Sequence, residues 1–393
     1  MNFRDRKGSV AVISALTMPL VIAGAGFGVE TGFDFYVQVK LQQAADAAAF
    51  GGGVEQQRGS SPATVLAAAT AAAQQNGFTS ATDTIQVTSP SATSVKASLT
   101  RGQPRMFSAM FVNTPLVIGA NAVAAYGSAS SACILALDPT ASGAASFAGS
   151  SSTTLNNCVV MANSISSSAI SVQGAAQLTT PCLYTVGGVS ITSGAHLSCS
   201  PAKTGLSPIG DPYASLPIPS DTSLPCLSAS QHMTPGRYCT SVTFHNNTTF
   251  DAGQYFFDGG IKTNANASLG LSASSPGGVT FFFMDSANID INGSSHVNLS
   301  APTTGAYAGM LLVGARTNSN VSNNINGDAT SSMTGAIYFP AQDVSYIGNF
   351  SGTNGCTQIV AKTISWSGNA SLAVNCSAYG MQSIAVGSVT LVG

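Results

Sequence analysis

Hydrophobic residues dominate the start of the chain, where residues 8–29 carry no charged side chain. As a helix, a stretch of this length covers the roughly 30 Å hydrocarbon core of a bilayer. Arg4, Arg6 and Lys7 precede the stretch, and Glu30 follows it. Basic residues before a span stay in the cytoplasm, so the pattern predicts a single-pass anchor with a cytoplasmic N-terminus and an exported body.

A cleavable signal peptide is the alternative interpretation of the same residues. A basic start, an apolar run at 10–22 and the small residues at 23–25 are its features. The anchor is favoured because the apolar character continues past residue 25 and a helical pattern follows it. Both interpretations export the body, and a mature protein that begins at Gly26 would contradict the anchor.

Helical spacing continues beyond the apolar stretch. Residues 33–50 contain no Gly or Pro, so one long helix is expected to reach residue 50, where Gly51-Gly52-Gly53 stops or hinges it. A second, Ala-rich helix is predicted between Ser60-Ser61-Pro62 and Asn76-Gly77. Strands are expected at 84–88, 94–99 and 116–126, with a helical turn near 104–111. These elements predict an anchor over 1–57 and a small α+β stalk module over 58–130.

The N-terminal segment carries a recognisable string, Leu-Gln-x-Ala-x-Asp-Ala-Ala-x at 41–49, behind the apolar stretch and Gly28-Val29-Glu30. Over about residues 6–53 the chain resembles the N-terminal module of TadG-like proteins of the tight-adherence (Flp) pilus system. The resemblance implies an inner-membrane anchor with an exported body. It also implies other tight-adherence pilus components as partners, in pilus assembly or surface attachment.

The chain departs from that family in specific places. Glu30 stands where the family often has Asp, and no Asp-x-Ser-x-Ser string supports a von Willebrand-type metal-dependent domain. The residue five places after Gly8 is Ile13 rather than Glu, so no prepilin processing is expected.

A degenerate sequence motif repeats from Cys133 onward. It consists of an apolar residue, a variable residue and Gly, followed by small or amide residues, then Leu or Val and often Cys. Its copies are centred on Gly149, Gly174, Gly194, Gly293 and Gly368. Short strands with alternating apolar and polar residues, joined by Gly and Asn corners, predict a parallel β-solenoid over 131–393. A β-sandwich with Ser/Thr-rich strands is the alternative.

Proline interrupts this repeat over residues 201–225, where little apolar pattern remains. The segment predicts a long surface insertion or linker, clamped where Cys226 and Cys239 close a short loop.

Composition narrows the class of protein. Charged residues make up 7% of the chain, against about 25% in a typical soluble domain, and the net charge is −2. This balance gives no basic surplus for nucleic acid and does not fit a coiled coil or a disordered chain. Stacked coils disfavour repeated like charges, so low charge also fits the solenoid.

The chain has 8 cysteines, all after residue 132 and none in a C-x-x-C pair. Their even number predicts disulfides in an oxidising compartment, with buried free thiols as the alternative. Cys182–Cys199 and Cys356–Cys376 are the preferred pairs.

Candidate catalytic groups are sparse. The chain has 4 histidines, none in a metal-ligand spacing, and residues 288–293 imitate a calcium loop but have Leu299 at the position of the closing Glu. Ile289 and Ile291 instead show the alternate spacing of apolar residues that is typical of a half-buried strand. No catalytic, cofactor-binding or metal-binding residue is therefore assigned, and no cofactor is expected.

The sequence thus predicts a non-enzymatic envelope protein of the tight-adherence system, with the ligand of its C-terminal domain unknown. A secreted β-helix adhesin with a cleaved signal peptide is one alternative. A β-helix polysaccharide-active enzyme is another, and it requires two or more carboxylates within bonding reach of one another. The available acidic residues for that role are Asp251, Asp258, Asp285 and Asp290.

Overall fold

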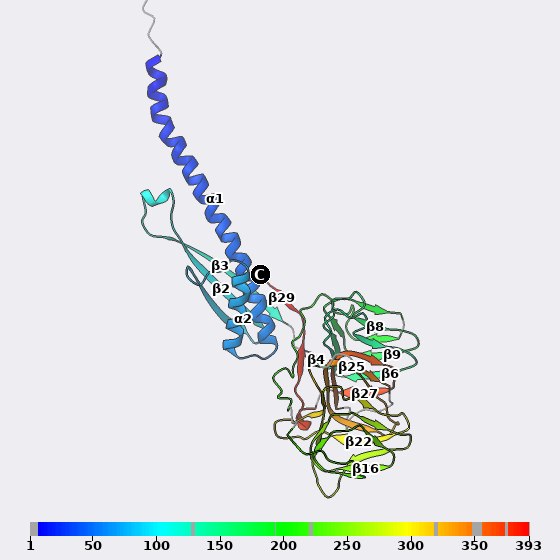
Figure 1. Ribbon diagram of the computed structural model, residues 1–393. Coiled ribbons are helices and arrows are strands. Elements are labelled where there is room, and N and C mark those ends of the chain that lie inside the picture. Colours follow the sequence, from blue (N-terminus) through cyan, green and yellow to red (C-terminus); the bar gives the residue numbers. More distant parts are fainter. Residues whose placement is uncertain are drawn as a thin grey trace, which may run out of the picture. The chain divides into compact units, whose positions relative to one another are not determined.

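The computed structural model describes residues 7–126, 130–192, 194–219, 223–317, 321–347, 356–373 and 376–392 (Figure 1). Within these residues the chain forms two compact units. The first contains the residues up to 126 and those from 387 onward, and the second contains residues 130–386. The protein is mainly β, with one long apolar N-terminal helix.

The first unit is a helix pair on an antiparallel sheet of order β1-β2-β3-β29. The elements are α1 (Lys7–Gln57), α2 (Pro62–Gln75), β1 (Asp83–Ser91), β2 (Ser94–Gln103), the 3-10 turn η1 (Ser108–Met110), β3 (Leu116–Tyr126) and β29 (Val389–Leu391). The expected second helix, turn and strands are confirmed. Ser61 caps α2 by accepting a hydrogen bond from the N–H of Thr64, and Pro62 is its first residue.

The expected stop at Gly51-Gly52-Gly53 is wrong, because α1 continues to Gln57. A Cβ on Gly51 would lie 3.0 Å from the Cβ of Ala72, and one on Gly53 would lie 3.1 Å from that of Ala124. Close approach to α2 and to the sheet therefore explains these glycines, which do not break the helix.

The division between the two units lies close to the boundary expected at 130, whereas the boundary expected at 57 lies inside the first unit. The predicted anchor and stalk module form one unit because the second half of α1 packs on the sheet. Residues from 387 onward also join this unit, because β29 pairs with β3 and places Thr390 opposite Ala125. The chain thus passes between the two units twice.

The second unit consists of parallel strands in three columns, with short loops between columns. The first column holds β13 (His232–Met233), β16 (Asn247–Phe250), β19 (Ser268–Leu271), β22 (His296–Ser300) and the start of β25 (Ser332–Tyr346). A separate sheet of order β12-β9-β6-β27 holds β12 (Ala195–Leu197), β9 (Gln177–Thr180), β6 (Ser152–Asn156) and β27 (Ala370–Ala373).

The second column runs in the order β14 (Gly236–Tyr238), β17 (Gly253–Phe257), β20 (Val279–Phe283), β23 (Met310–Gly314), β25, β26 (Thr357–Trp366), β4 (Ser130–Ala136), β7 (Cys158–Ala162) and β10 (Leu183–Thr185). The third column runs in the order β15 (Val242–Phe244), β18 (Ile261–Thr263), β21 (Ile289–Asp290), β24 (Ser322–Ile325), β25, β26, β5 (Ala145–Phe147), β8 (Ile170–Val172) and β11 (Val189–Ile191).

This parallel pairing does not fit the antiparallel sheets of the β-sandwich alternative. Gly149, Gly174 and Gly194 have φ of 74°, 71° and 68°, the left-handed backbone expected of Gly at corners. The 3-10 turn η3 (Ser377–Tyr379) and the antiparallel strand β28 (Ile384–Val386), which pairs with β4, complete the unit.

Strands from the two ends of the unit meet in the middle of the stack. β4, near the start, pairs with β26, near the end, and Ile134 lies opposite Ile359. The strands of residues 130–197 extend the columns in one direction from this junction, and the strands that begin at His232 lie in the other. The intervening segment therefore has to run from one end of the stack to the other.

The proline-rich segment is that connection, and its apolar side chains are partly buried against the strands. Ile209, Tyr213, Leu216, Ile218 and Leu224 pack on the outer face of the second column. Tyr213 is buried, and its hydroxyl bonds to Gln358.

The two ends of the same segment cover the terminal strands of the second column. Lys203 exchanges backbone hydrogen bonds with Leu183 and Thr185 at β10, and the N–H of Leu227 donates to the carbonyl of Arg237 at β14. Both contacts pair backbone N–H and C=O groups at the edges of the column, which would otherwise be open to pairing with a strand of another chain.

The core between the columns is rich in aromatic rings that stack along the columns. Phe257 stacks on Phe283 with 5.9 Å between ring centroids. Gly314 lies opposite Phe283, and a Cβ there would lie 2.3 Å from Cδ1 of Phe339. This glycine leaves the room in which Phe339 contacts Phe283 at 5.6 Å.

All the cysteines are paired, and the expected pairs are confirmed. Cys182–Cys199 and Cys356–Cys376 form as preferred, Cys226–Cys239 closes the predicted short loop, and Cys133 pairs with Cys158. The alternative of buried free thiols is therefore wrong.

Candidate membrane-binding surface

The first half of α1 exposes its apolar side chains. Leu16, Leu20 and Val21 are 69%, 73% and 68% exposed, and the most apolar window of the helix reaches a mean hydropathy of 1.9 with none of it buried. This length and hydropathy fit a membrane span or a signal sequence. Arg4 and Arg6, which carry the orientation prediction, lie outside the described residues.

The second half of α1 is packed, and it contains the string that resembles the TadG-like module. Leu41, Ala44, Ala45, Ala48 and Ala49 are all buried in the core of the first unit. The same core contains Ala69 and Ala73 of α2 and the small and apolar sheet residues Ala97, Leu99, Ile118, Ala120, Ala122 and Ala124. Alanine at 44, 45, 48 and 49 lets the helix pack closely in the core formed with α2 and the sheet, which gives the string a structural role.

Glu30 lies between the exposed and the packed halves of α1 and binds a loop that is distant in the sequence. Its carboxylate accepts hydrogen bonds from the N–H of Met106 at 3.0 Å, the N–H of Ser108 at 2.7 Å and the hydroxyl of Ser108 at 2.7 Å. Glu30 is 6% exposed. The carboxylate thus serves as the cap of the turn η1, and it holds the end of the β2–β3 hairpin against the helix.

Aromatic packing reinforces this attachment one turn earlier in the helix. The Phe27 and Phe107 rings meet edge to face with 5.1 Å between centroids, and Phe111 lies 6.4 Å from both. Phe107 also covers Gly26, where a Cβ would lie 2.5 Å from its Cδ2. The missing side chain at Gly26 provides the notch in which Phe107 sits.

The rest of this loop is apolar and exposed. Met106, Met110, Phe111 and Val112 are 49%, 77%, 68% and 42% exposed. Arg105 lies at the base of the loop, where its Nε donates to the carbonyl of Thr114 at 2.8 Å. The apolar helix surface therefore continues onto a loop that is far away in the sequence.

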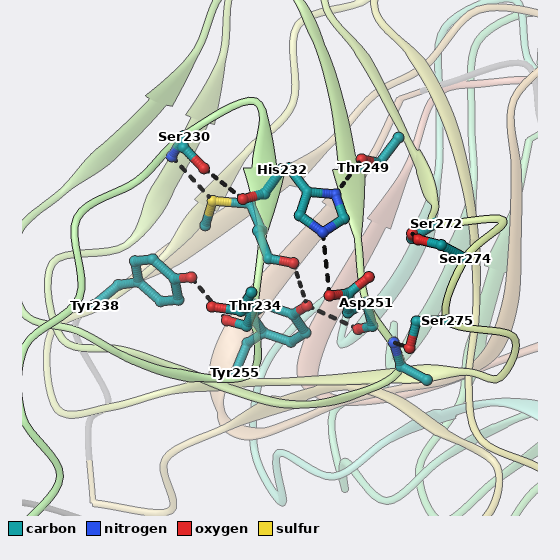
Figure 2. A network of polar contacts seen from close by, with 12 residues as sticks. Ser230, His232, Thr234, Tyr238, Thr249, Asp251, Tyr255, Ser272, Ser274 and Ser275 are labelled. Carbon is teal, nitrogen blue, oxygen red and sulfur yellow. Dashed lines mark hydrogen bonds and ion pairs between the residues drawn. The ribbon is translucent and has the colours of Figure 1, made fainter.

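The first acidic residue considered for an enzyme, Asp251, bonds to a histidine (Figure 2). Its Oδ2 lies 3.1 Å from Nε2 of His232, whose Nδ1 lies 3.1 Å from the hydroxyl of Thr249. The hydroxyl of Tyr255 donates to the carbonyl of Asp251 at 2.7 Å and to that of Met233 at 3.0 Å. This network joins the ends of neighbouring strands β13 and β16.

The other acidic residues have different neighbours. Asp258 pairs with Arg237 at 2.7 Å, and Asp290 lies 3.5 Å from Nζ of Lys262. Asp285 occupies a corner with φ of 40°. The structure thus pairs Asp251, Asp258 and Asp290 with three different basic side chains, and within the described residues no three of His, Cys, Asp and Glu gather as a metal site.

The calcium-like string is a strand and its corner. Ile289 and Ile291 are buried, as the half-buried strand requires, and Oδ1 of Asn292 accepts a hydrogen bond from the N–H of Ser294. Asp290 points outward to Lys262. The strand interpretation of 288–293 is confirmed.

The remaining histidines contact polar neighbours on adjacent strands and loops. His196 bonds to Gln177 at 3.2 Å, His245 to Asn264 at 2.5 Å, and His296 to Thr330 at 2.9 Å. Asp328 lies beside His296. Burial alone would raise the pKa of Asp328, but hydrogen bonds from Thr330, His296 and Ser331 outweigh it and lower the pKa to about 2.

An open hollow of about 360 Å³ lies on the second unit between the loops before β17 and β20 and the loop 302–307. Gln254, Thr280, Thr303, Thr304 and Tyr307 supply its polar groups, and the described side chains that line it are all uncharged.

Comparisons with protein-family models, with curated proteins and with solved structures found no match to this chain.

The attachment of the loop to the helix was missed by sequence reasoning. The available signals were a carboxylate directly after an uncharged stretch and the cluster of Met and Phe at 106–111. Neither signal says that the two segments meet, because 76 residues separate Glu30 from Met106.

Proposed function

We propose that this chain is a non-enzymatic, membrane-anchored envelope protein of the tight-adherence pilus system, related to TadG-like proteins. Its role is pilus assembly or pilus-associated surface adhesion, with other pilus components as partners. The observation that carries the proposal is the division of α1 into an exposed apolar half and a packed half. The packed half is the string at 41–49 on which the family resemblance depends.

The proposed topology is a single pass through the inner membrane with a cytoplasmic N-terminus. Lys7 begins α1, and the uncharged stretch 8–29 follows directly. The four disulfides support an oxidising, extracytoplasmic location for the second unit, because disulfides do not persist in a reducing cytosol. In this proposal the apolar helix is retained and is not removed as a signal peptide.

We further propose that the second unit is a disulfide-braced β-solenoid that presents a recognition surface. Its support is the register of the strands, in which Thr154 lies between Ser371 and Thr179 on neighbouring strands and Ser152 lies opposite Gln177. Repetition of this kind produces flat rows of hydroxyl and amide groups, which suit a polar surface ligand. The uncharged hollow beside Tyr307 lies on the same unit.

Deletion of the gene in a piliated bacterium that carries it tests the proposal. We expect loss of surface pili and of adherence, and restoration by the intact chain. A second complementing chain replaces residues 1–25 with a cleavable signal peptide, so that the body is exported without an anchor, and it is expected to restore neither property. Normal pili and adherence after deletion would refute the proposed function. Restoration by the unanchored body would refute only the need for the anchor.

A further inference from the structure

We propose that the loop 104–115 is a second membrane contact, which lies in the headgroup and upper acyl region of the bilayer beside α1. The inference rests on the proposed membrane anchorage of α1. It assigns to the first unit a lipid-binding surface made from two segments of the chain, the helix at 11–29 and the tip of the β2–β3 hairpin.

The chemistry of the loop matches a lipid interface. Met106, Met110, Phe111 and Val112 all present exposed apolar side chains. Contiguous exposed apolar residues of this kind mark a membrane or protein contact. Large apolar side chains that enter the boundary between headgroups and acyl chains bind membranes in proportion to the area they bury.

Continuity with the helix favours lipid as the occupant. Phe111 lies 6.4 Å from Phe27, so the exposed surface of the loop adjoins the exposed surface of α1 without a polar gap. The medium that surrounds Leu20 and Val21 in the span therefore also contacts the surface formed by Phe27 and the loop. A bilayer around the helix would reach the loop without any rearrangement of the unit.

The attachment sets the depth of the loop. Glu30 is the first charged residue after the uncharged stretch, so it marks the level at which the helix leaves the hydrocarbon core. Its hydrogen bonds to Met106 and Ser108 hold the loop at that level. Phe35 and Tyr36 lie exposed on the next turns, as aromatic residues do at a membrane interface.

Depth-dependent fluorescence quenching tests the proposal on the full-length protein. All native cysteines are in disulfides, so a single introduced cysteine accepts a nitrobenzoxadiazole label. The labelled positions are F111C in the loop, V21C in the span and A92C at the β1–β2 turn, at the other end of strand β2 from the loop. The protein is reconstituted into phosphatidylcholine and phosphatidylglycerol vesicles, with and without a lipid that carries a nitroxide high on its acyl chain.

We expect the nitroxide lipid to quench F111C to an extent comparable with V21C and to leave A92C unquenched. Quenching at V21C without quenching at F111C would overturn the membrane contact of the loop and leave the anchor standing. A blue shift at F111C that depends on protein concentration but not on the nitroxide would overturn it in favour of a protein contact. No quenching at V21C would refute the anchor itself.

Two glycines of α1 provide a matched pair of variants for the attachment. Alanine at Gly26 would clash with Phe107, whereas a Cβ at Gly28 meets nothing within 4 Å. Both substitutions favour the helix equally, by about 1 kcal/mol. In the F111C background we expect Gly26→Ala to weaken the quenching and Gly28→Ala to leave it unchanged. Unchanged quenching in both variants would show that this contact does not set the depth of the loop.

Discussion

The carboxylate of Glu30 accepts two hydrogen bonds from Ser108, one from its N–H and one from its hydroxyl, each 2.7 Å long. The contact joins a helix to a loop 78 residues later. Because the carboxylate is buried, it compensates for donors that water does not reach.

Replacement of Glu30 by Ala is expected to free the backbone N–H groups of Met106 and Ser108. Hydrogen–deuterium exchange of the peptide covering 104–112, measured on the protein in detergent micelles, is expected to speed up severalfold. The sheet is expected to keep its protection, because Glu30 lies outside the core of the unit. Glu55→Ala is the control, since Glu55 pairs with the neighbouring Arg58. Equal exchange in the wild type and Glu30→Ala would contradict the role assigned to the carboxylate.

Asp83 and Arg101 form a second buried contact in the first unit. Nε of Arg101 donates to Oδ1 of Asp83 at 2.6 Å, and the N–H of Thr79 donates to Oδ2 at 2.8 Å. Removing one partner of such a pair leaves the other uncompensated, so Asp83→Asn is expected to destabilise the unit by about 3 kcal/mol. Thermal unfolding followed by circular dichroism measures the loss. Glu55→Gln, which breaks a more exposed pair, is expected to cost less than about 1 kcal/mol.

The Asp83–Arg101 pair also makes a contribution to the stability of the first unit that is lost in acid. Burial alone would raise the pKa of Asp83, but hydrogen bonds from Arg101, Thr79 and Thr82 outweigh it and lower the pKa below its usual value of 3.8. A lowered folded-state pKa stabilises the protein above the unfolded-state pKa, and this contribution disappears as the pH falls through the folded-state value. The difference in free energy of unfolding between wild type and Asp83→Asn is therefore expected to be constant near neutral pH and to shrink below about pH 4. A gap that stays constant down to pH 2 would contradict this account.

The disulfide Cys133–Cys158 joins strands β4 and β7 and closes 25 residues. Its replacement by two serines is expected to lower the free energy of unfolding of the second unit by about 2–4 kcal/mol, since the unfolded chain regains the freedom of that loop. The matched pair Cys226–Cys239 closes only 13 residues, so its replacement is expected to cost less. Chemical denaturation under non-reducing conditions compares the two variants, and the reverse order would contradict the loop-entropy explanation.

Gly314 and Gly270 allow a direct test of packing in the second unit. Alanine at Gly314 would clash with the Phe339 ring, whereas a Cβ at Gly270 meets nothing within 4 Å. Both glycines lie in strands and neither has a positive φ. Gly314→Ala is expected to destabilise the unit by about 1–3 kcal/mol through overpacking, and Gly270→Ala is expected to be neutral or slightly stabilising. Equal stability of the two variants in denaturant titrations would contradict the assigned role of Gly314.

The sequence by itself determined the local elements of this protein. An uncharged stretch of fixed length, an N-cap at Ser61, alternating strands and Gly corners are all signals carried by neighbouring residues, and the structure confirms them. Local spacing also favoured two of the four disulfides, because Cys182–Cys199 and Cys356–Cys376 join segments that are close along the chain, but it did not determine the full pairing.

Only the tertiary structure decided which distant segments meet. No local pattern places Ile134 beside Ile359, returns β29 to the first sheet, or brings Glu30 to Ser108. The proline-rich segment showed little apolar pattern of its own because the apolar surface that its side chains cover is built by strands elsewhere in the chain. The glycines at 51–53 looked like a helix stop for the same reason, since the atoms that need the space belong to α2 and the sheet. Contacts of this kind depend on the volumes and unpaired groups of both partners, and a single segment carries only half of that information.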